Sequence, residues 1–138
     1  MAQLKRTIVK TEKAPLPLGA YSQAIRTQPG ELMFLAGQVA VNNDGNLVGA
    51  GDVVAQTRQI FENIGGVLSS AGASFSNIVE MTSYVVGRES LQGFIQARTE
   101  LFPDIFPDAD YPPNTLLVVG GLVADQYLVE VSAIAVLP

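Results

Sequence analysis

The C-terminal segment from Tyr111 to Pro138 restricts the fold of this chain more than any other part of it. It holds two apolar, β-rich runs joined by a short turn, and the second run carries one carboxylate, Glu130. Runs of this composition and length are typical of strands. A charge inside such a strand is costly unless it is paired, hydrated in a cleft or exposed to water. Glu130 therefore has two interpretations, a solvent-facing residue of an alternating strand or a residue that carries chemistry.

The rest of the chain predicts further strands and two helices. Three β-rich runs predict strands: 7–10, 32–36 and 78–86. Apolar residues at helical spacing predict one helix that begins after the N-cap Asp52 and stops at Gly72. A second amphipathic helix is predicted over Glu89–Phe102, and Pro103 is expected to end it.

This order of elements predicts an α+β fold. The succession strand, strand, helix, strand, helix, strand, strand suits a two-layer sandwich in which both helices cover one face of a sheet. A chain of 138 residues suits one domain, and we expect residues 1–138 to form it. With 48% hydrophobic and only 15% charged residues, the chain is more apolar than a small monomer requires, which favours contacts between subunits.

The charge balance argues against nucleic acid and anionic membranes as partners. The formal net charge is -5, and all eight basic residues lie at or before Arg98. The absence of cysteine excludes disulfides and thiolate zinc sites, and the absence of histidine removes the commonest metal ligand and general base. We therefore expect no metal and no cofactor, and catalysis that relies on carboxylates, hydroxyls, amides or water.

The hydropathy of the chain predicts a cytoplasmic protein. No window reaches the roughly 18 consecutive apolar residues that a membrane helix needs. Residues 1–13 are polar and interrupted by basic side chains, unlike a secretory leader.

Three separated blocks carry a resemblance that extends over nearly the whole chain. They are Gly19-Ala20-Tyr21-Ser22-Gln23-Ala24, Ala36-Gly37-Gln38-Val39 and Val129-Glu130-Val131-Ser132-Ala133-Ile134-Ala135. In this order and spacing they resemble the Rid family, the reactive intermediate deaminases, also called YjgF proteins. The resemblance implies a fold like bacterial chorismate mutase with a mixed sheet, and a homotrimer whose sheets form a central barrel. It also implies small-molecule clefts between neighbouring subunits.

The resemblance assigns expected roles to several residues. Active members of the family hydrolyse an imine or enamine of a 2-keto acid to the keto acid and ammonia. A glutamate that positions or deprotonates water corresponds to Glu130, which is the expected catalytic residue. Tyr21 and Gly37 correspond to a tyrosine and a glycine of the substrate-binding pocket.

One departure from the family pattern concerns the substrate anchor. An arginine of the family binds the substrate carboxylate with two parallel hydrogen bonds, and its place is taken here by Asn114. A charge-assisted contact is about twice as strong as a neutral one, so binding of a small 2-imino acid is expected to suffer. The segment between Asn114 and Glu130 is also one residue longer than the usual spacing.

A second departure lies on the second predicted helix and the strand after it. Ile95 replaces a pocket asparagine, Arg98 replaces a tyrosine, and Leu116 stands where a small residue is usual. Arg98 shares the apolar stripe of that helix and has three interpretations: snorkelling past the apolar edge, pairing across a subunit interface, or supplying the missing cation to a ligand.

Two functions follow from these observations. The first is a hydrolase of C–N bonds that acts on an enamine, imine or related compound, with Glu130 directing water and Asn114, Tyr21, Gly37 and Arg98 at the ligand. The second is a non-catalytic ligand-binding or interaction protein on the same trimer. Loss of the arginine favours the second, and retention of Glu130 favours the first.

Overall fold

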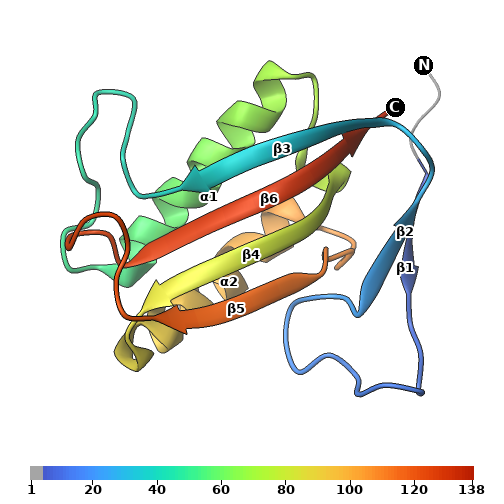
Figure 1. Ribbon diagram of the computed structural model, residues 1–138, viewed down its shortest axis with the longest axis horizontal. Coiled ribbons are helices and arrows are strands. Elements are labelled where there is room, and N and C mark those ends of the chain that lie inside the picture. Colours follow the sequence, from blue (N-terminus) through green and yellow to red (C-terminus); the bar gives the residue numbers. More distant parts are fainter. Residues whose placement is uncertain (1–4) are drawn as a thin grey trace.

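The computed structural model describes residues 5–138 of the chain, so the first residues of the expected domain lie outside the described part (Figure 1). Its strands and helices are β1 (Arg6–Val9), β2 (Ala24–Thr27), β3 (Glu31–Gln38), α1 (Val53–Ser70), β4 (Ile78–Val86), α2 (Leu91–Ile105), β5 (Asn114–Val119) and β6 (Val129–Leu137). Single 3₁₀ turns, Phe75–Asn77 and Arg88–Ser90, precede β4 and α2.

Four strands form a mixed sheet in the order β3-β6-β4-β5. The pair β4 and β5 is parallel, whereas β6 runs antiparallel to both of its neighbours. The strands β1 and β2 form a separate antiparallel ribbon. Both helices cover one face of the four-stranded sheet, and Figure 1 looks onto the other, uncovered face. The predicted α+β class, with two layers and both helices on one face, is confirmed.

The caps of α1 follow the sequence prediction. The Asp52 carboxylate accepts a hydrogen bond of 3.0 Å from the backbone N–H of Ala55, which satisfies one free donor of the first turn. The helix ends at Ala71, and Gly72 continues with a φ of 74°, a left-handed conformation that favours glycine. Local chemistry therefore sets both ends of this helix.

Three local expectations were wrong or incomplete. Pro103 lies inside α2, which continues to Ile105. Proline removes one intrahelical hydrogen bond, but Phe106 N–H still bonds the Phe102 carbonyl at 2.8 Å, so the last turn survives. The strand β2 was not predicted. The connection between β5 and β6 is the loop 120–128 rather than a short turn.

The core lies between the helices and the inner face of the sheet. Along β6, Val129, Val131, Ala133 and Ala135 are buried, in strict alternation with less buried residues. They pack in one cluster with α1 and α2 side chains such as Ile64 and Phe94. Glu130 belongs to the alternate set, so its side chain lies on the uncovered face of the sheet.

The uncovered face carries apolar side chains at its β3 edge. Leu32 is 59% exposed and Phe34 is 71% exposed, and Phe34 is opposite Ile134 of β6. Neighbouring exposed apolar side chains of this kind favour a contact with another molecule. Within residues 5–138, no helix has the length and apolar character needed to span a membrane.

Candidate functional site

Glu130 and Gly37 meet where β6 begins and β3 ends, and we call this pair the acid half-site. The β3–β6 register shifts between Leu35 and Gln38, and this irregularity brings Gly37 beside Glu130. A Cβ atom on Gly37 would lie 2.0 Å from Glu130 Oε1. Only glycine therefore leaves room for the carboxylate against the backbone.

The Glu130 carboxylate is half-buried, yet it has no hydrogen bond or ion pair to any residue of 5–138. A carboxylate that is neither ion-paired nor hydrogen-bonded to a donor is available as a proton acceptor.

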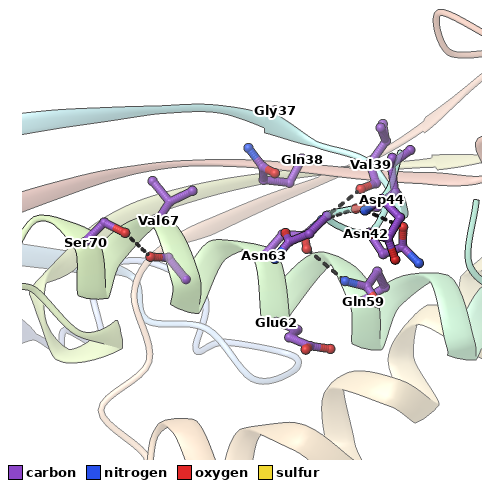
Figure 2. Close-up of a pocket in the computed structure, with 13 residues that line it drawn as sticks. Gly37, Gln38, Val39, Asn42, Asp44, Gln59, Glu62, Asn63, Val67 and Ser70 are labelled. Carbon is purple, nitrogen blue, oxygen red and sulfur yellow. Dashed lines mark hydrogen bonds between the residues drawn. The ribbon is translucent and has the colours of Figure 1, made fainter. Parts of the chain in front are cut away.

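A large hollow adjoins the acid half-site through Gly37. It has a volume of about 870 Å³ and lies between the end of β3, the loop after it and one face of α1, as Figure 2 shows. Its main polar groups bond one another. Asn63 Nδ2 donates to the Val41 carbonyl at 2.9 Å, and Gln59 Nε2 donates to Asn63 Oδ1 at 2.8 Å. These bonds hold the loop after Gly37 against α1.

The buried amide of Gln56 holds the other side of the acid half-site. Its side chain is 0% exposed, and its Nε2 donates to the carbonyls of Gly49 and Gln126, each at 3.0 Å. Its Oε1 accepts from Leu128 N–H at 2.9 Å. Leu128 lies two residues before Glu130, so this fully bonded amide fixes the entry into β6.

A second group of predicted residues lines one cavity of about 460 Å³, and we call Tyr21, Arg98 and Asn114 the anchor half-site. The other lining residues are Leu18, Gly19, Thr115 and Leu116. The cavity lies between the loop before β2, the helix α2 and the start of β5. It combines one cation and one amide with two leucine side chains.

Arg98 supplies the charge of the anchor half-site. Its side chain is 8% exposed, and its guanidinium carbon is 5.5 Å from the centre of the Phe94 ring. Burial lowers the pKa of the Arg98 guanidinium, an effect that Tyr21 and Tyr111 oppose. No carboxylate of residues 5–138 pairs with it. A guanidinium remains charged when buried, so Arg98 is a cation without an ion-pair partner in the described part of the chain, and a bound anion would be favourable there.

The buried residue Ser83 holds the Asn114 side chain by a hydrogen bond. The Ser83 hydroxyl donates to Asn114 Oδ1 at 2.8 Å, and Ser83 itself is 1% exposed. Tyr21 has a comparable local bond, because its hydroxyl accepts from Leu18 N–H at 3.1 Å. The loop that carries Leu18 is thereby fixed over the cavity, with Leu18 itself 96% exposed.

The two half-sites lie on opposite faces of the sheet. Asn114 is opposite Met81 in the β4–β5 register, and Met81 is a buried, helix-facing residue. Glu130 is opposite Tyr84 in the β4–β6 register, three residues further along β4. An odd separation along a strand places side chains on opposite faces. One copy of the chain therefore cannot bring Asn114 and Glu130 to the same ligand.

The sequence predicts five site residues. The structure places two of them in the acid half-site and three in the anchor half-site. The sequence prediction missed Ser83 and Gln56, which hold Asn114 and the entry to Glu130. Both leave a signal in the sequence: Ser83 is a polar residue at an inward position of an apolar strand, and Gln56 lies on the buried side of α1. Ile95, named as a pocket departure, is 43% exposed and does not line the anchor cavity.

Comparison with known proteins connects this geometry to a family. The family described as Endoribonuclease L-PSP matches residues 11–137. A RutC family protein of Pyrococcus abyssi is 34% identical over 132 residues, which are 96% of this chain and 98% of that protein. A 2-iminobutanoate/2-iminopropanoate deaminase of Capra hircus is 30% identical over 136 residues, 99% of this chain and 93% of that protein.

Solved structures agree with the sequence matches. A protein of unknown function of the conserved Rid protein family, YyfB from Yersinia pestis, superposes with a TM-score of 0.86 at 31% identity. The superposition covers 96% of this chain and 98% of that one. TdcF of E. coli with bound serine superposes with a TM-score of 0.69 at 27% identity, over 96% of this chain and 99% of that one.

Proposed function

We propose a function from one premise, which is that this chain belongs to the endoribonuclease L-PSP family, also called the Rid, YjgF or RutC family. The chain forms a homotrimer, and it hydrolyses an imine, enamine or related carbonyl-derived nitrogen compound. Its fold is the chorismate mutase-like fold of Rid structures. The products are a carbonyl compound and ammonia. Each reaction takes place in a cleft between two subunits, with the acid half-site from one and the anchor half-site from the other.

The observation that carries this proposal is the separation of the half-sites. Among residues 5–138, Glu130 pairs with no cation and Arg98 pairs with no carboxylate, and the sheet places the two on opposite faces. A second copy is the simplest source of the missing half. The exposed apolar residues Leu32 and Phe34 provide a surface for that contact.

The proposed chemistry needs one water and no cofactor. Glu130 takes a proton from a water molecule as its oxygen bonds to the carbon of the C=N group. The nitrogen gains two protons, the first from Glu130 as the carbinolamine forms and the second from the carbinolamine hydroxyl. The C–N bond then breaks, and ammonia leaves as the C=O bond forms. The proton held by Glu130 is returned to nitrogen, so the carboxylate is regenerated. Arg98, Asn114 and Tyr21 hold the remainder of the substrate, with Gly37 beside Glu130.

The relatives support this class of chemistry. The goat relative is named a 2-iminobutanoate/2-iminopropanoate deaminase, and TdcF was solved with serine bound. RNA cleavage, which the family description suggests, gains no support from a chain of net charge -5. The cytoplasmic location stays a prediction.

The test is ammonia release from freshly generated 2-imino acids of increasing side-chain size. Wild-type protein is expected to accelerate hydrolysis, and Glu130→Gln to lose at least about 100-fold because the base is gone. Asn114→Arg is expected to improve turnover of the smallest imino acids. Hydrolysis that is equally fast with Glu130→Gln, or absent with every substrate, would overturn the enzymatic proposal.

A second function has one specific observation in its favour. Residue 114, the expected carboxylate anchor, is an uncharged asparagine that is hydrogen-bonded to Ser83. A trimer that binds carbonyl compounds in the same clefts without turnover would tolerate this change. Keto acid binding without ammonia release, in both the wild type and Asn114→Arg, would favour this binding protein over the enzyme.

A further inference from the structure

We infer that Ser83 determines which end of the Asn114 amide faces the cleft, and thereby makes the anchor half-site selective for a ligand carboxylate. The inference rests on the proposed function in one respect, namely that the ligand occupies the anchor cavity. It extends that function by naming a positioning residue and the chemical group that is recognised.

The geometry begins with a buried donor. The Ser83 hydroxyl has only the side chain of Asn114 as its hydrogen-bond partner within residues 5–138, at 2.8 Å, and Ser83 is 1% exposed. Leaving this hydroxyl unbonded in the core is unfavourable. Because the hydroxyl donates to Oδ1, the Asn114 carbonyl oxygen is held against β4, and the two N–H bonds of the amide remain for the cavity.

The cavity then presents donors from two directions. Asn114 contributes the N–H bonds of its amide, and Arg98 contributes a guanidinium that has donors and no acceptor. A carboxylate accepts hydrogen bonds at both oxygens and neutralises Arg98, so it satisfies both groups. A carboxamide of the same shape would turn its own N–H bonds towards one of them.

The remaining walls of the cavity determine which substituent the ligand carries beside its carboxylate. Leu18 and Leu116 line the same cavity, and neither offers a side-chain hydrogen bond. An apolar substituent beside the carboxylate would cover them. The ligand class that fits is thus a 2-keto or 2-imino acid with an aliphatic side chain, held by its carboxylate.

The first test compares two probes by calorimetry, 4-methyl-2-oxopentanoate and its amide, on the wild-type trimer and Ser83→Ala. Without the hydroxyl the Asn114 amide is free to rotate. We expect Ser83→Ala to weaken binding of the acid about tenfold, the size of one lost hydrogen bond to a charged group, and to reduce the preference for acid over amide. An unchanged preference would overturn the inference, as would a wild-type protein that binds neither probe.

Ser90→Ala is the matched control. Ser90 is also buried, and its hydroxyl also makes one hydrogen bond, to the Val86 carbonyl, but it does not line the anchor cavity. It should leave the preference for the acid unchanged. A Ser90→Ala variant that loses this preference as Ser83→Ala does would show that weakened core packing, and not the Asn114 orientation, is responsible. That result would overturn the inference.

A second variant avoids the risk that a core substitution prevents folding. Asn114→Asp has the same shape and keeps an acceptor for Ser83, but its other oxygen would then face the cavity. We expect it to weaken acid binding about 100-fold, because a donor is replaced by a negative charge. Acid binding as tight as in the wild type would overturn the inference. Both tests measure binding, so acid selectivity without ammonia release would refute only the enzymatic proposal.

Discussion

The acid half-site and the anchor half-site are built in opposite ways from the same sheet. Glu130 is held by steric fit, on the bare backbone of Gly37, and has no polar partner within residues 5–138. Asn114 and Tyr21 are held by hydrogen bonds to Ser83 and Leu18, and Arg98 is held by burial beside Phe94. One half-site supplies a proton acceptor without an anchor, and the other supplies an anchor without a proton acceptor.

The two half-sites are complementary. Each half-site is locally well formed, yet neither has the full set of groups that hydrolysis of an anionic substrate requires. The alternation of β6 and β5 keeps them apart in one copy, so the proposed functional unit is a cleft assembled from two copies.

Gly37→Ala tests whether steric fit positions Glu130. The new methyl group would lie 2.0 Å from Glu130 Oε1 and must displace the carboxylate. We expect ammonia release to fall about 100-fold, as for loss of a general base. Gly66→Ala is the control, because a Cβ there meets nothing within 4 Å, and in helix α1 it should stabilise the fold by about 1 kcal/mol. Equal activity in the two variants would refute the steric role.

Mixed trimers test whether the half-sites come from different copies. Glu130→Gln and Arg98→Ala should each be nearly inactive, but co-expressed subunits would form some interfaces in which both half-sites are intact. Random mixing makes about one interface in four complete, so about a quarter of the wild-type ammonia release should return. Mixed trimers as inactive as either variant alone would place both half-sites in one subunit.

Gln56→Ala tests the support of the acid half-site through stability. The variant loses three buried hydrogen bonds and removes the partner of the Gln126 carbonyl and of the Leu128 N–H, whereas the Gly49 carbonyl keeps its bond from Asp52 N–H at 2.9 Å. We expect unfolding in urea to require about 3 kcal/mol less free energy. Gln59 is half-buried, and its side chain bonds only Asn63 within residues 5–138, so Gln59→Ala should lose about 0.5 kcal/mol. A loss for Gln56→Ala no larger than that of its control would remove Gln56 from this role.

Tyr21→Phe has the smallest expected effect. It removes the hydroxyl that accepts from Leu18 N–H at 3.1 Å, in a loop that water already reaches. A loss of about 0.5 kcal/mol of stability and about threefold weaker keto acid binding are expected. Binding that falls 100-fold with unchanged stability would instead indicate that Tyr21 contacts the reacting atoms.

Sequence patterns predicted the layers of this fold better than its junctions. Apolar periodicity identified both helices and the long strands, because these elements bury whole faces. The strand β2 is only four residues long and has little alternation, and its pairing with β1 depends on residues far away in the chain. A proline ordinarily ends a helix, yet α2 tolerates Pro103 within its last turn.

For the site, the sequence named residues but not their grouping. Motif positions identified Glu130, Gly37, Tyr21 and Asn114, and an unusual charge on an apolar stripe identified Arg98. Which residues share a face depends on strand register, and the register shift in β3 leaves no mark that a single sequence reveals. The bond from Ser83 to Asn114 joins β4 to the start of β5, so only the parallel pairing of these strands discloses it.

The most direct test of the composite cleft is a crystal structure of the protein grown with 4-methyl-2-oxopentanoate. We expect a keto acid between two copies, its carboxylate bound by Arg98 and the Asn114 amide of one copy. Glu130 of the neighbouring copy should face the keto carbon. An assembly in which Glu130 and Arg98 of adjacent copies face away from each other, or a keto acid bound within a single copy, would contradict the composite cleft.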